Sequence, residues 1–344
     1  MIFDLPESVY CYAFSLRKQR LLRHFIPHVK VKSLSRSQSL SGSATVLIWG
    51  AEPAASHWPS STRIIRVEDG FLRSVGLGAD LVRPVSWVFD SRGIYFDASS
   101  ASDLEWLLEN ASVDNGLLER ADSLVKKVIE LGLTKYNVGA NSWQRPLPAS
   151  RVILVPGQVE TDASIRLAAI GVKTNLALLQ EVRNTNPDAY VIYKPHPDVV
   201  AGLRAKGSQE HLCSNYCNEV LTDVPMNDLI NMVDEVHVMT SLAGFEALLR
   251  GRKVICYGLP FYAGWSLTHD MLTCNRRTRE RSLNELVACA LILYPIYFSY
   301  EKSRVTDPEQ ILGELVRLRE KRRHSESKWR SMLRWSLRKI LSRP

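Results

Sequence analysis

The sequence predicts an α/β protein made of two domains that face each other across a cleft. Short apolar segments rich in β-branched residues alternate along the chain with segments of helical periodicity. The apolar segments are nearly continuous, which favours parallel sheets that are covered on both faces. The length of 344 residues exceeds what one hydrophobic core usually supports, so two domains are expected.

These patterns place the expected elements along the chain. Strands are predicted at 44–49, 62–67, 86–90, 152–155, 190–193, 235–239 and 253–257. Helices are predicted at 16–25, 101–111, 115–131, 164–183, 226–232, 242–250, 282–293 and 308–323. The segment 134–150 has no period and carries two prolines, so we interpret it as a linker. The predicted domains are therefore 1–145 and 146–316, followed by a tail at 317–344.

The net charge of +8 is concentrated in that tail. Residues 317–344 hold eleven Lys and Arg and two Glu, a net +9, which leaves the rest of the chain at −1. Because the main body is neutral, nucleic acid is not an expected partner. In the tail, Trp329 and Leu333 belong to an apolar stripe at helical spacing with basic residues beside it. That pattern is typical of an amphipathic helix on an anionic membrane surface, and a solvated terminus is the alternative.

Neither a signal peptide nor a membrane-spanning segment is predicted. The start of the chain lacks a basic region followed by a long apolar one, and the longest uncharged segment, 286–300, is interrupted by Pro295. Six cysteines in a chain of this length do not indicate a disulfide framework. We therefore expect a cytoplasmic protein, or one bound to a membrane from the cytosolic side.

Two carboxylates end the strand predicted at 62–67. Glu68 and Asp69 are adjacent, and burying both is costly because like charges repel and lose water. In a continuing strand they point to opposite faces, so one of them serves a site, and we favour Glu68. A solvated turn before Gly70 is the alternative.

A second polar group follows the strand predicted at 152–155. Gln158 and Asp162 come after a Pro-Gly break, and Asp162 lies close to the start of a helix. An Asp at that position is most often an N-cap. The alternative is a nucleophile or base that points into the cleft.

Two further strand ends carry groups suited to an anionic ligand. Lys194 and His196 follow the strand at 190–193, and Pro197 restricts the backbone beside the imidazole. Ser241 begins the helix at 242–250, where it is a natural N-cap beside an anion site, and Glu246 in the second turn is placed to reach ribose hydroxyls. The chain has no Walker A sequence and no clean G-x-G-x-x-G motif, which disfavours P-loop phosphotransfer and a standard dinucleotide fold. It has no paired zinc ligands, so a structural zinc site is not expected.

Five further segments are VEDGFLRSVGLGADLVRPVSWVFDSRGIYFDASSASDLEWLL (67–108), GQVETDASI (157–165), YKPHPD (193–198), HVMTSLAGFEALLRGRKVICYGLPFYAGW (237–265) and RSLNELVACALILYP (281–295). Together they resemble the bacterial capsule β-Kdo transferases of the KpsC type. The resemblance extends from about residue 10 to about residue 300. KpsC proteins carry two such modules and this chain has one, whose opening is more similar to the start of the second module.

The resemblance implies a GT-B-like fold with two Rossmann-like domains, an N-terminal one on the acceptor side and a C-terminal one for the CMP-sugar. It also implies CMP-β-Kdo as donor and retention of configuration by double displacement. The acceptor would be a glycan or glycolipid of the capsule, O-antigen or lipopolysaccharide, and partner glycosyltransferases are possible. Together with the basic tail, a lipid-linked acceptor predicts a cytoplasmic enzyme bound peripherally to the inner membrane. A non-catalytic glycan-binding or scaffold role in capsule biosynthesis is the alternative.

The same resemblance assigns roles to the residues at the strand ends. Asp162 would be the nucleophile, and Glu68 of the E-D-G motif, which includes Asp69, would be the general acid/base. The remaining predicted ligands of the donor are Gln158, Lys194, His196, Pro197, Ser241 and Glu246. A retaining mechanism needs two carboxylates on opposite sides of the reacting carbon, which agrees with these roles. Arg73 is suited to pair with the carboxylate of the sugar. CMP leaves with one phosphate, and we expect no metal.

Overall fold

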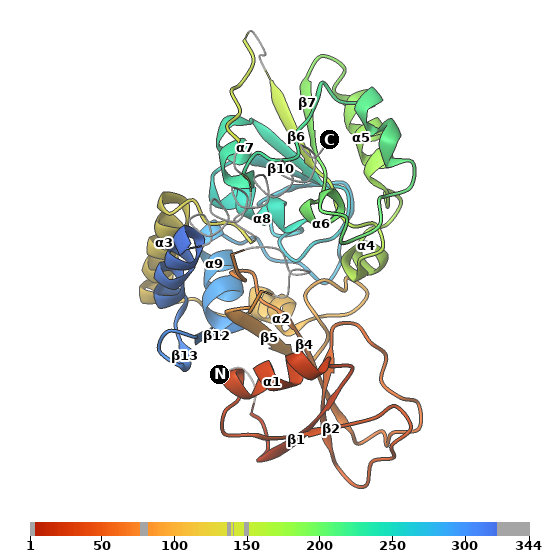
Figure 1. Ribbon diagram of the computed structural model, residues 1–344, viewed down its shortest axis with the longest axis vertical. Helices are drawn as coiled ribbons and strands as arrows, with labels where there is room; N and C mark the ends of the chain where they lie inside the picture. The colour runs from red at the N-terminus through yellow and green to blue at the C-terminus, as the bar shows by residue number, and fades with distance from the viewer. Residues whose placement is uncertain (1–3, 76–81, 136–138, 140, 148–150, 322–344) are drawn as a thin grey trace, which may run out of the picture.

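The computed structural model describes residues 4–75, 82–135, 139, 141–147 and 151–321, which form two lobes along the long axis of the molecule (Figure 1). Within these residues the strands form one sheet of seven strands in the lower lobe and one of six in the upper lobe. The mixed α/β class predicted from the sequence is confirmed.

The first sheet is mixed in strand direction. Its order is β13-β12-β5-β4-β3-β1-β2, and β1 to β4 run parallel whereas β5, β12 and β13 are antiparallel to their neighbours. The strands are β1 (Ser8–Tyr12), β2 (Lys30–Ser33), β3 (Thr45–Trp49), β4 (Arg63–Asp69), β5 (Ser86–Asp90), β12 (Pro295–Ser299) and β13 (Arg304–Thr306). The expectation of a parallel sheet is wrong here. All five residues of β5 are buried, so its continuous apolar sequence reflects burial on both faces and not strand direction.

The second sheet is parallel throughout, as expected. Its order is β11-β10-β9-β6-β7-β8, and the central strand β6, with the sequence VILVP, is completely buried. The strands are β6 (Val152–Pro156), β7 (Tyr190–Lys194), β8 (Glu219–Val220), β9 (Glu235–Val238), β10 (Lys253–Cys256) and β11 (His269–Asp270). Ligands bind outside the carboxyl ends of strands in such sheets, so this edge is the place to look for a site.

Most helices lie where the sequence periodicity predicts them. The helices are α1 (Leu16–Phe25), α2 (Asp103–Asn110), α3 (Asn115–Glu130), α4 (Ala163–Ala168), α5 (Asn175–Thr185), α6 (Pro197–Val200), α7 (Met226–Met232), α8 (Leu242–Leu249) and α9 (Leu283–Val287), which continues as a π-helix η3 (Ala288–Leu293). The helix predicted at 164–183 is instead two helices. Gly171 has a φ of +84° between them, and the Thr174 hydroxyl caps α5 by accepting from the Ala177 N–H at 3.1 Å.

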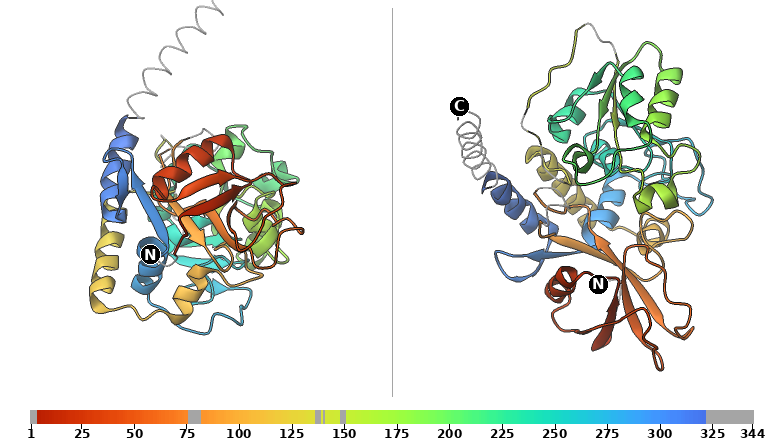
Figure 2. Two further views of the ribbon diagram at one scale, coloured as in Figure 1. Left: turned by 90° about the horizontal axis from the view of Figure 1, so that it is seen from below. Right: turned by 45° about the vertical axis from the view of Figure 1, so that its right-hand side comes forward.

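The C-terminal part of the described chain returns to the first lobe. The predicted second domain ran to residue 316, but β12 and β13 hydrogen-bond into the first sheet. Residues 308–321 form a helix that lies beside α3 (Figure 2). The Arg120 Nε to Glu309 Oε1 distance is 2.8 Å, and Arg319 donates to the Leu131 and Gly132 carbonyls. The tail helix predicted beyond residue 321 lies outside the described residues.

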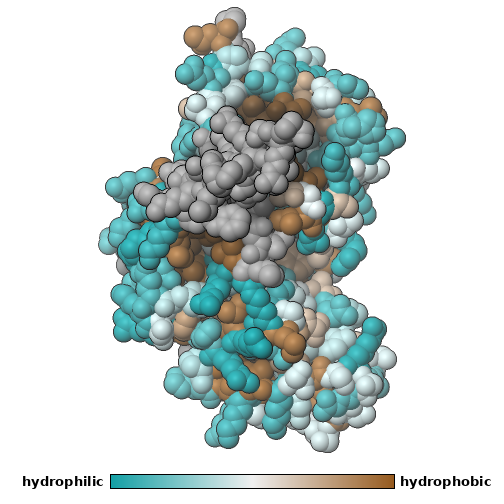
Figure 3. All heavy atoms as spheres, in the orientation of Figure 1, coloured by the Kyte–Doolittle hydropathy of each residue, from teal (hydrophilic) through white to brown (hydrophobic). Residues whose placement is uncertain are grey.

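The two lobes share one hydrophobic core, although the outline of the molecule narrows between them (Figure 3). That core joins Phe71 and Leu104 of the lower lobe to Val236 and Phe245 of the upper lobe. No helix in the described part of the chain is long and apolar enough to cross a membrane.

Candidate active site

Three adjacent strands of the second sheet end in predicted site residues. Asp162 follows β6, His196 follows β7 and Ser241 follows β9, and β9, β6 and β7 are consecutive in the sheet. The helices after β6 and β7, α4 and α6, lie on the side of the upper lobe that faces the lower lobe (Figure 1). These helices therefore lie on the side of the first sheet, in which Glu68 and Asp69 end β4.

Asp162 occupies the N-cap position of α4, but its side chain makes no cap hydrogen bond. The carboxylate instead pairs with Arg204, whose Nη2 lies 3.4 Å from Asp162 Oδ1. Both side chains are about half exposed, at 45 % for Asp162 and 51 % for Arg204. The carboxylate is therefore held at a strand end and open to solvent, which a capping role does not require.

His196 is fixed by its own helix. It is the N-cap of the short helix α6, and its Nδ1 accepts a hydrogen bond from the Asp198 N–H at 3.1 Å. Pro197 occupies the first helical position, where its missing N–H has no consequence. Burial lowers the pKa of His196 to about 4, assisted by the charges of Lys135 and Arg204. The imidazole is thus neutral at pH 7, and because Nδ1 accepts, its proton lies on Nε2, which is a donor.

Gln158 and Lys194 are engaged by protein groups. The Gln158 amide donates from Nε2 to Thr240 Oγ1 at 3.0 Å and accepts from the Thr240 N–H at 2.9 Å, which ties the end of β6 to the end of β9. The Lys194 ammonium donates to the Thr222 carbonyl at 3.3 Å, and burial lowers its pKa to about 8. These two residues brace the edge of the sheet.

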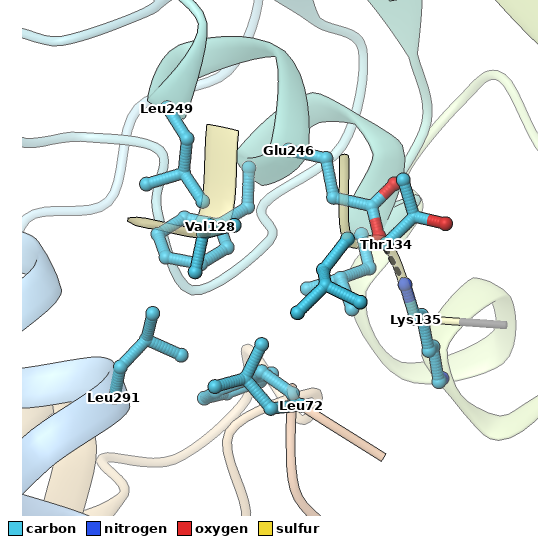
Figure 4. Close-up of a pocket in the computed structure, with 11 residues that line it drawn as sticks. Leu72, Val128, Thr134, Lys135, Glu246, Leu249 and Leu291 are labelled. Atoms are coloured by element: carbon cyan, nitrogen blue, oxygen red, sulfur yellow. Dashed lines mark hydrogen bonds between the residues drawn. The ribbon is translucent and has the colours of Figure 1, made fainter. Parts of the chain in front are cut away.

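Ser241 and Glu246 are both held by α8 and its surroundings. The Ser241 hydroxyl accepts from the Ala243 N–H at 3.2 Å, and the hydroxyl of the fully buried Tyr262 donates to the Ser241 carbonyl. Glu246 Oε1 accepts from the backbone N–H of Lys135 at 2.6 Å (Figure 4). Burial raises the pKa of Glu246. The carboxylate stands at the rim of a small apolar pocket between the lobes, lined in part by Leu72, Val128 and Leu291.

Glu68, at the end of β4, is held in surroundings that shift the pKa of its carboxyl group. Its Oε1 accepts from the Asp69 N–H at 3.0 Å. Gly50, with a φ of +60°, leaves room for it, since a Cβ there would lie 3.2 Å from Glu68 Oε2. Burial and the neighbouring charge of Asp69 raise the pKa of Glu68 to about 7. A carboxyl group with that pKa exchanges protons readily near neutral pH.

Asp69 is paired inside the first domain. Its Oδ2 receives the Arg73 Nε–H at 2.6 Å, and its Oδ1 receives the Trp87 indole N–H at 3.1 Å. Arg73 also donates to the Ser74 hydroxyl at 2.8 Å. The structure therefore separates the two adjacent carboxylates, because Asp69 is bound by Arg73 and Trp87 while Glu68 is not.

Three cations that the sequence reasoning did not single out belong to this region. Lys18 in α1 lies 3.4 Å from the centroid of the Trp49 ring and acts electrostatically on Glu68 and Asp69. Lys135 lies in the segment predicted as a linker, and Arg204 in the loop after α6. The positive charge of Lys135 acts to lower the pKa of Glu68, His196 and Glu246. The charge of Arg204 acts to lower the pKa of His196, and its guanidinium pairs with Asp162. No short motif marks them, because their proximity arises from the tertiary fold.

A metal centre is not formed by the described residues. In that part of the chain no three or more His, Cys, Asp or Glu side chains are grouped to hold a metal ion.

Comparison with known proteins identifies the family of the chain. The profile described as capsule polysaccharide biosynthesis protein matches residues 115–301. The chain is 41 % identical over 346 residues to the capsule polysaccharide modification protein LipA of Neisseria meningitidis serogroup B, a match that covers 98 % of this chain and 49 % of LipA. The chain thus spans about half the length of the curated relatives it matches.

Two solved structures have a similar fold along nearly the whole chain. The Thermosulfurimonas dismutans KpsC structure described as a beta Kdo 2,7 transferase is 39 % identical with a TM-score of 0.74, and the one described as a beta Kdo 2,4 transferase is 30 % identical with a TM-score of 0.77. Each match covers 91 % of this chain and 99 % of the solved chain. The chain therefore belongs to the capsule polysaccharide biosynthesis protein family, and its predicted resemblance to KpsC-type Kdo transferases is confirmed.

Proposed function

We propose that this chain is a retaining β-Kdo glycosyltransferase that uses CMP-β-Kdo to add Kdo to a cell-surface glycan or glycolipid. The observation that carries the proposal is the contrast between two carboxylates, Glu68 at the end of β4 in the first sheet and Asp162 after β6 in the second. Asp162 is open to solvent beside Arg204, whereas Glu68 is buried with a pKa raised to about 7 by burial and by Asp69. A buried carboxyl group with a raised pKa is suited to proton transfer and an exposed carboxylate to attack, which are the two carboxyl roles in retaining glycosyl transfer.

The similarity to two KpsC structures supports a GT-B arrangement, with the acceptor bound by the lower lobe and CMP-β-Kdo by the upper lobe. Ser241 and the Nε2–H of His196 are suited to the phosphate, and Glu246 to the ribose. Gln158 supports the site through its hydrogen bond with the Thr240 N–H, and Lys194 through its hydrogen bond with the Thr222 carbonyl. Asp69, which is held by Arg73, positions its neighbour Glu68. Neither Asp69 nor Arg73 takes a direct part in the proposed chemistry.

The proposed reaction has two displacements. In the first, a carboxylate oxygen of Asp162 forms a bond to the anomeric carbon of Kdo while the bond to the CMP phosphate breaks and CMP leaves. In the second, the acceptor hydroxyl attacks that carbon, its proton passes to Glu68, and the bond to Asp162 breaks. Two inversions at one carbon retain the β configuration.

The test is a transfer assay with CMP-Kdo generated in situ and a Kdo-tipped acceptor. CMP release and a β-linked product are expected from the wild type, and Asp162→Asn and Glu68→Gln are expected to lose at least about 100-fold in rate. Asp188→Asn and Glu130→Gln change exposed carboxylates away from these strand ends and serve as controls. Glycan binding without turnover would favour the non-catalytic alternative.

The basic tail is proposed to hold the enzyme on the cytoplasmic face of the inner membrane, near a lipid-linked acceptor. This rests on the sequence pattern of 317–344. Deleting 325–344 is expected to release the protein from anionic vesicles in a flotation assay while sparing activity on a soluble acceptor. Undiminished flotation of the truncated protein would refute the tether.

A further inference from the structure

We propose that the outer face of α1, which consists of Leu16, Arg17, Arg20 and Arg23, binds the anionic surface of a lipid bilayer. We call these four residues the α1 basic face. The inference goes beyond the proposed transfer reaction, because it concerns a surface of the folded first lobe and needs no turnover. It gives the chain a membrane contact in addition to the one proposed for the tail at 317–344.

The charge of residues 1–316 is unevenly distributed along the chain. Between Glu7 and Glu52 the chain carries seven Lys and Arg and no Asp or Glu. This segment forms β1, α1, β2 and β3, and its three strands are the last ones at one end of the first sheet. A basic region is therefore part of the folded lobe, although the main body as a whole is nearly neutral. Such a region attracts anionic partners.

The helix α1 presents part of this charge to solvent. One face of α1 packs into the core of the first lobe, and no acidic residue occurs in the helix. The opposite face carries Leu16, Arg20 and Arg23, which follow at intervals of four and three residues and are all exposed, Leu16 at 74 %. Arg17 is partly exposed in the same first turn. An exposed leucine among arginines is suited to a surface that offers both phosphates and apolar chains.

The arginines of the α1 basic face have no carboxylate partner among the described residues. No carboxylate there lies within ion-pair distance of Arg17, Arg20 or Arg23. In contrast, the partly exposed Arg120 and Arg145 pair with carboxylates at 2.8 and 2.7 Å. The three guanidinium groups of α1 thus keep their charge for an external anion, and a guanidinium binds phosphate oxygens with two hydrogen bonds.

The position of the α1 basic face favours a flat and extended partner. His24 of α1 stacks on Phe298 of β12 with 4.8 Å between the ring centroids, and the helix at 308–321 follows β12 and β13 in the chain. In both views of Figure 2, α1 and the last turn of that helix lie on one side of the molecule. After residue 321 the sequence carries eight more Lys and Arg and one Glu. A bilayer can contact both regions, and stable anchoring of a peripheral protein takes two contacts, so loss of either one should release the chain.

A bilayer on this face would also bring a lipid-linked acceptor close to Glu68. The strands β1, β3 and β4 run parallel, and α1 begins at Leu16 shortly after the carboxyl end of β1. Leu16 therefore lies at the same edge of the first sheet as Glu68, which is near the carboxyl end of β4. Lys18 agrees with this placement, because its Nζ lies 3.4 Å from the centroid of the ring of Trp49, the last residue of β3.

The experiment is flotation of the full chain with vesicles of phosphatidylcholine that contain about 30 % phosphatidylglycerol, with pure phosphatidylcholine as reference. The wild type is expected to float only with the anionic vesicles, and less as salt rises. The triple variant Arg17→Gln, Arg20→Gln, Arg23→Gln is expected to lose at least about tenfold in apparent affinity for them. The corresponding triple substitution to Lys keeps the charge and should stay within about threefold of the wild type.

The matched control removes three exposed cations of the upper lobe. It carries Arg166→Gln, Lys173→Gln and Lys206→Gln, which change the net charge by the same amount. This variant is expected to float with an affinity within about threefold of the wild type, because its substitutions lie away from the proposed contact. Thermal denaturation verifies that each variant is folded.

Each outcome decides for or against the α1 basic face. A wild type that does not float, an unchanged affinity in the glutamine variant of α1, or an equal loss in the control would overturn the proposal. Unchanged flotation together with a raised KM for a soluble Kdo-tipped acceptor would assign the face to glycan binding instead. A wild type that floats through this face and transfers no Kdo would contradict the proposed function and leave the membrane contact supported.

Discussion

Glu68 and Asp69 are adjacent in the sequence yet have different environments. Asp69 is held by Arg73 at 2.6 Å and by the Trp87 indole at 3.1 Å, whereas Glu68 receives only a backbone N–H among the hydrogen bonds described. Burial and the charge of Asp69 then raise the pKa of Glu68 to about 7. The sequence could predict that one carboxylate faces a site, because neighbours on a strand point to opposite faces. It could not predict Lys135 or Arg204, whose positions depend on distant segments.

The pH dependence of transfer should report the ionisation of Glu68. The residue must be ionised to accept the proton of the acceptor, so kcat is expected to rise with pH through about 7 and then reach a plateau. His196, with its pKa lowered to about 4 chiefly by burial, should add no step between pH 5 and 9. A pH profile of kcat under saturating substrates tests this. The step should vanish in the residual activity of Glu68→Gln, and a step that persists there would belong to another group.

Ionisation of Glu68 should lower the free energy of unfolding of the protein. The folded state keeps the Glu68 proton up to about pH 7, and the unfolded chain releases it near 4.5, so stability falls as pH rises between those values. Glu68→Gln should therefore stabilise the protein by up to about 3 kcal/mol at pH 8 and by little at pH 4.5. Urea denaturation at the two pH values measures the difference. An equal effect at both pH values would show that burial does not disfavour the ionised form of Glu68.

At the scale of elements, α8, which carries Ser241 and Glu246, is held by close packing against a buried side chain. In α8, a Cβ added to Gly244 would overlap the hydroxyl of the buried Tyr262, the group that holds the Ser241 carbonyl. In the helix at 308–321, a Cβ on Gly313 would meet only the far end of the Arg317 side chain, at 3.3 Å.

The same substitution should therefore have opposite effects in these two helices. Gly244→Ala is expected to destabilise the protein by about 2 kcal/mol or more because the overlap displaces a buried ring. Gly313→Ala is expected to stabilise it by about 0.5–1 kcal/mol through helix propensity. Chemical denaturation of both variants provides the comparison. Similar values for the two would show that the contact with Tyr262 is unimportant.

The central strands of both sheets could be predicted from the sequence, and strand order could not. The strands predicted at 86–90 and 152–155 agree with β5 and β6 to within a residue, because continuous β-branched segments report burial directly. The strands nearer the sheet edges, β1, β2, β8, β11, β12 and β13, were missed. β12 begins at Pro295 and lies far along the chain from β5, so nothing local indicates that it joins the first sheet.

At the scale of the whole molecule, the two lobes are joined by buried charge as well as by a shared core. Glu105 in α2 accepts from Arg276 Nε at 2.6 Å and from Arg277 Nε at 3.0 Å, and the Arg277 side chain is 3 % exposed. Arg277 also donates to the Pro260 and Ala263 carbonyls. This cluster fixes the loop after β10 against the first domain.

Removal of Glu105 should therefore be far more damaging than removal of a surface partner. Glu105→Ala leaves the Arg277 charge buried and unpaired, and we expect a loss of about 3–5 kcal/mol. Glu301→Ala breaks an exposed pair with Arg317 and should cost at most about 1 kcal/mol. Thermal and urea denaturation of both variants tests this. Comparable losses would mean that the Glu105 cluster does not join the lobes.

The central claim, that Asp162 attacks the anomeric carbon of CMP-Kdo, is tested most directly by mass spectrometry of the intact protein and its peptides. Glu68→Gln exposed to CMP-Kdo should accumulate one Kdo group on the peptide containing Asp162, because the second displacement is slowed. Asp162→Asn should carry none under the same conditions. A wild-type protein that transfers Kdo while Glu68→Gln carries no adduct, or carries it on a peptide without Asp162, would contradict the account.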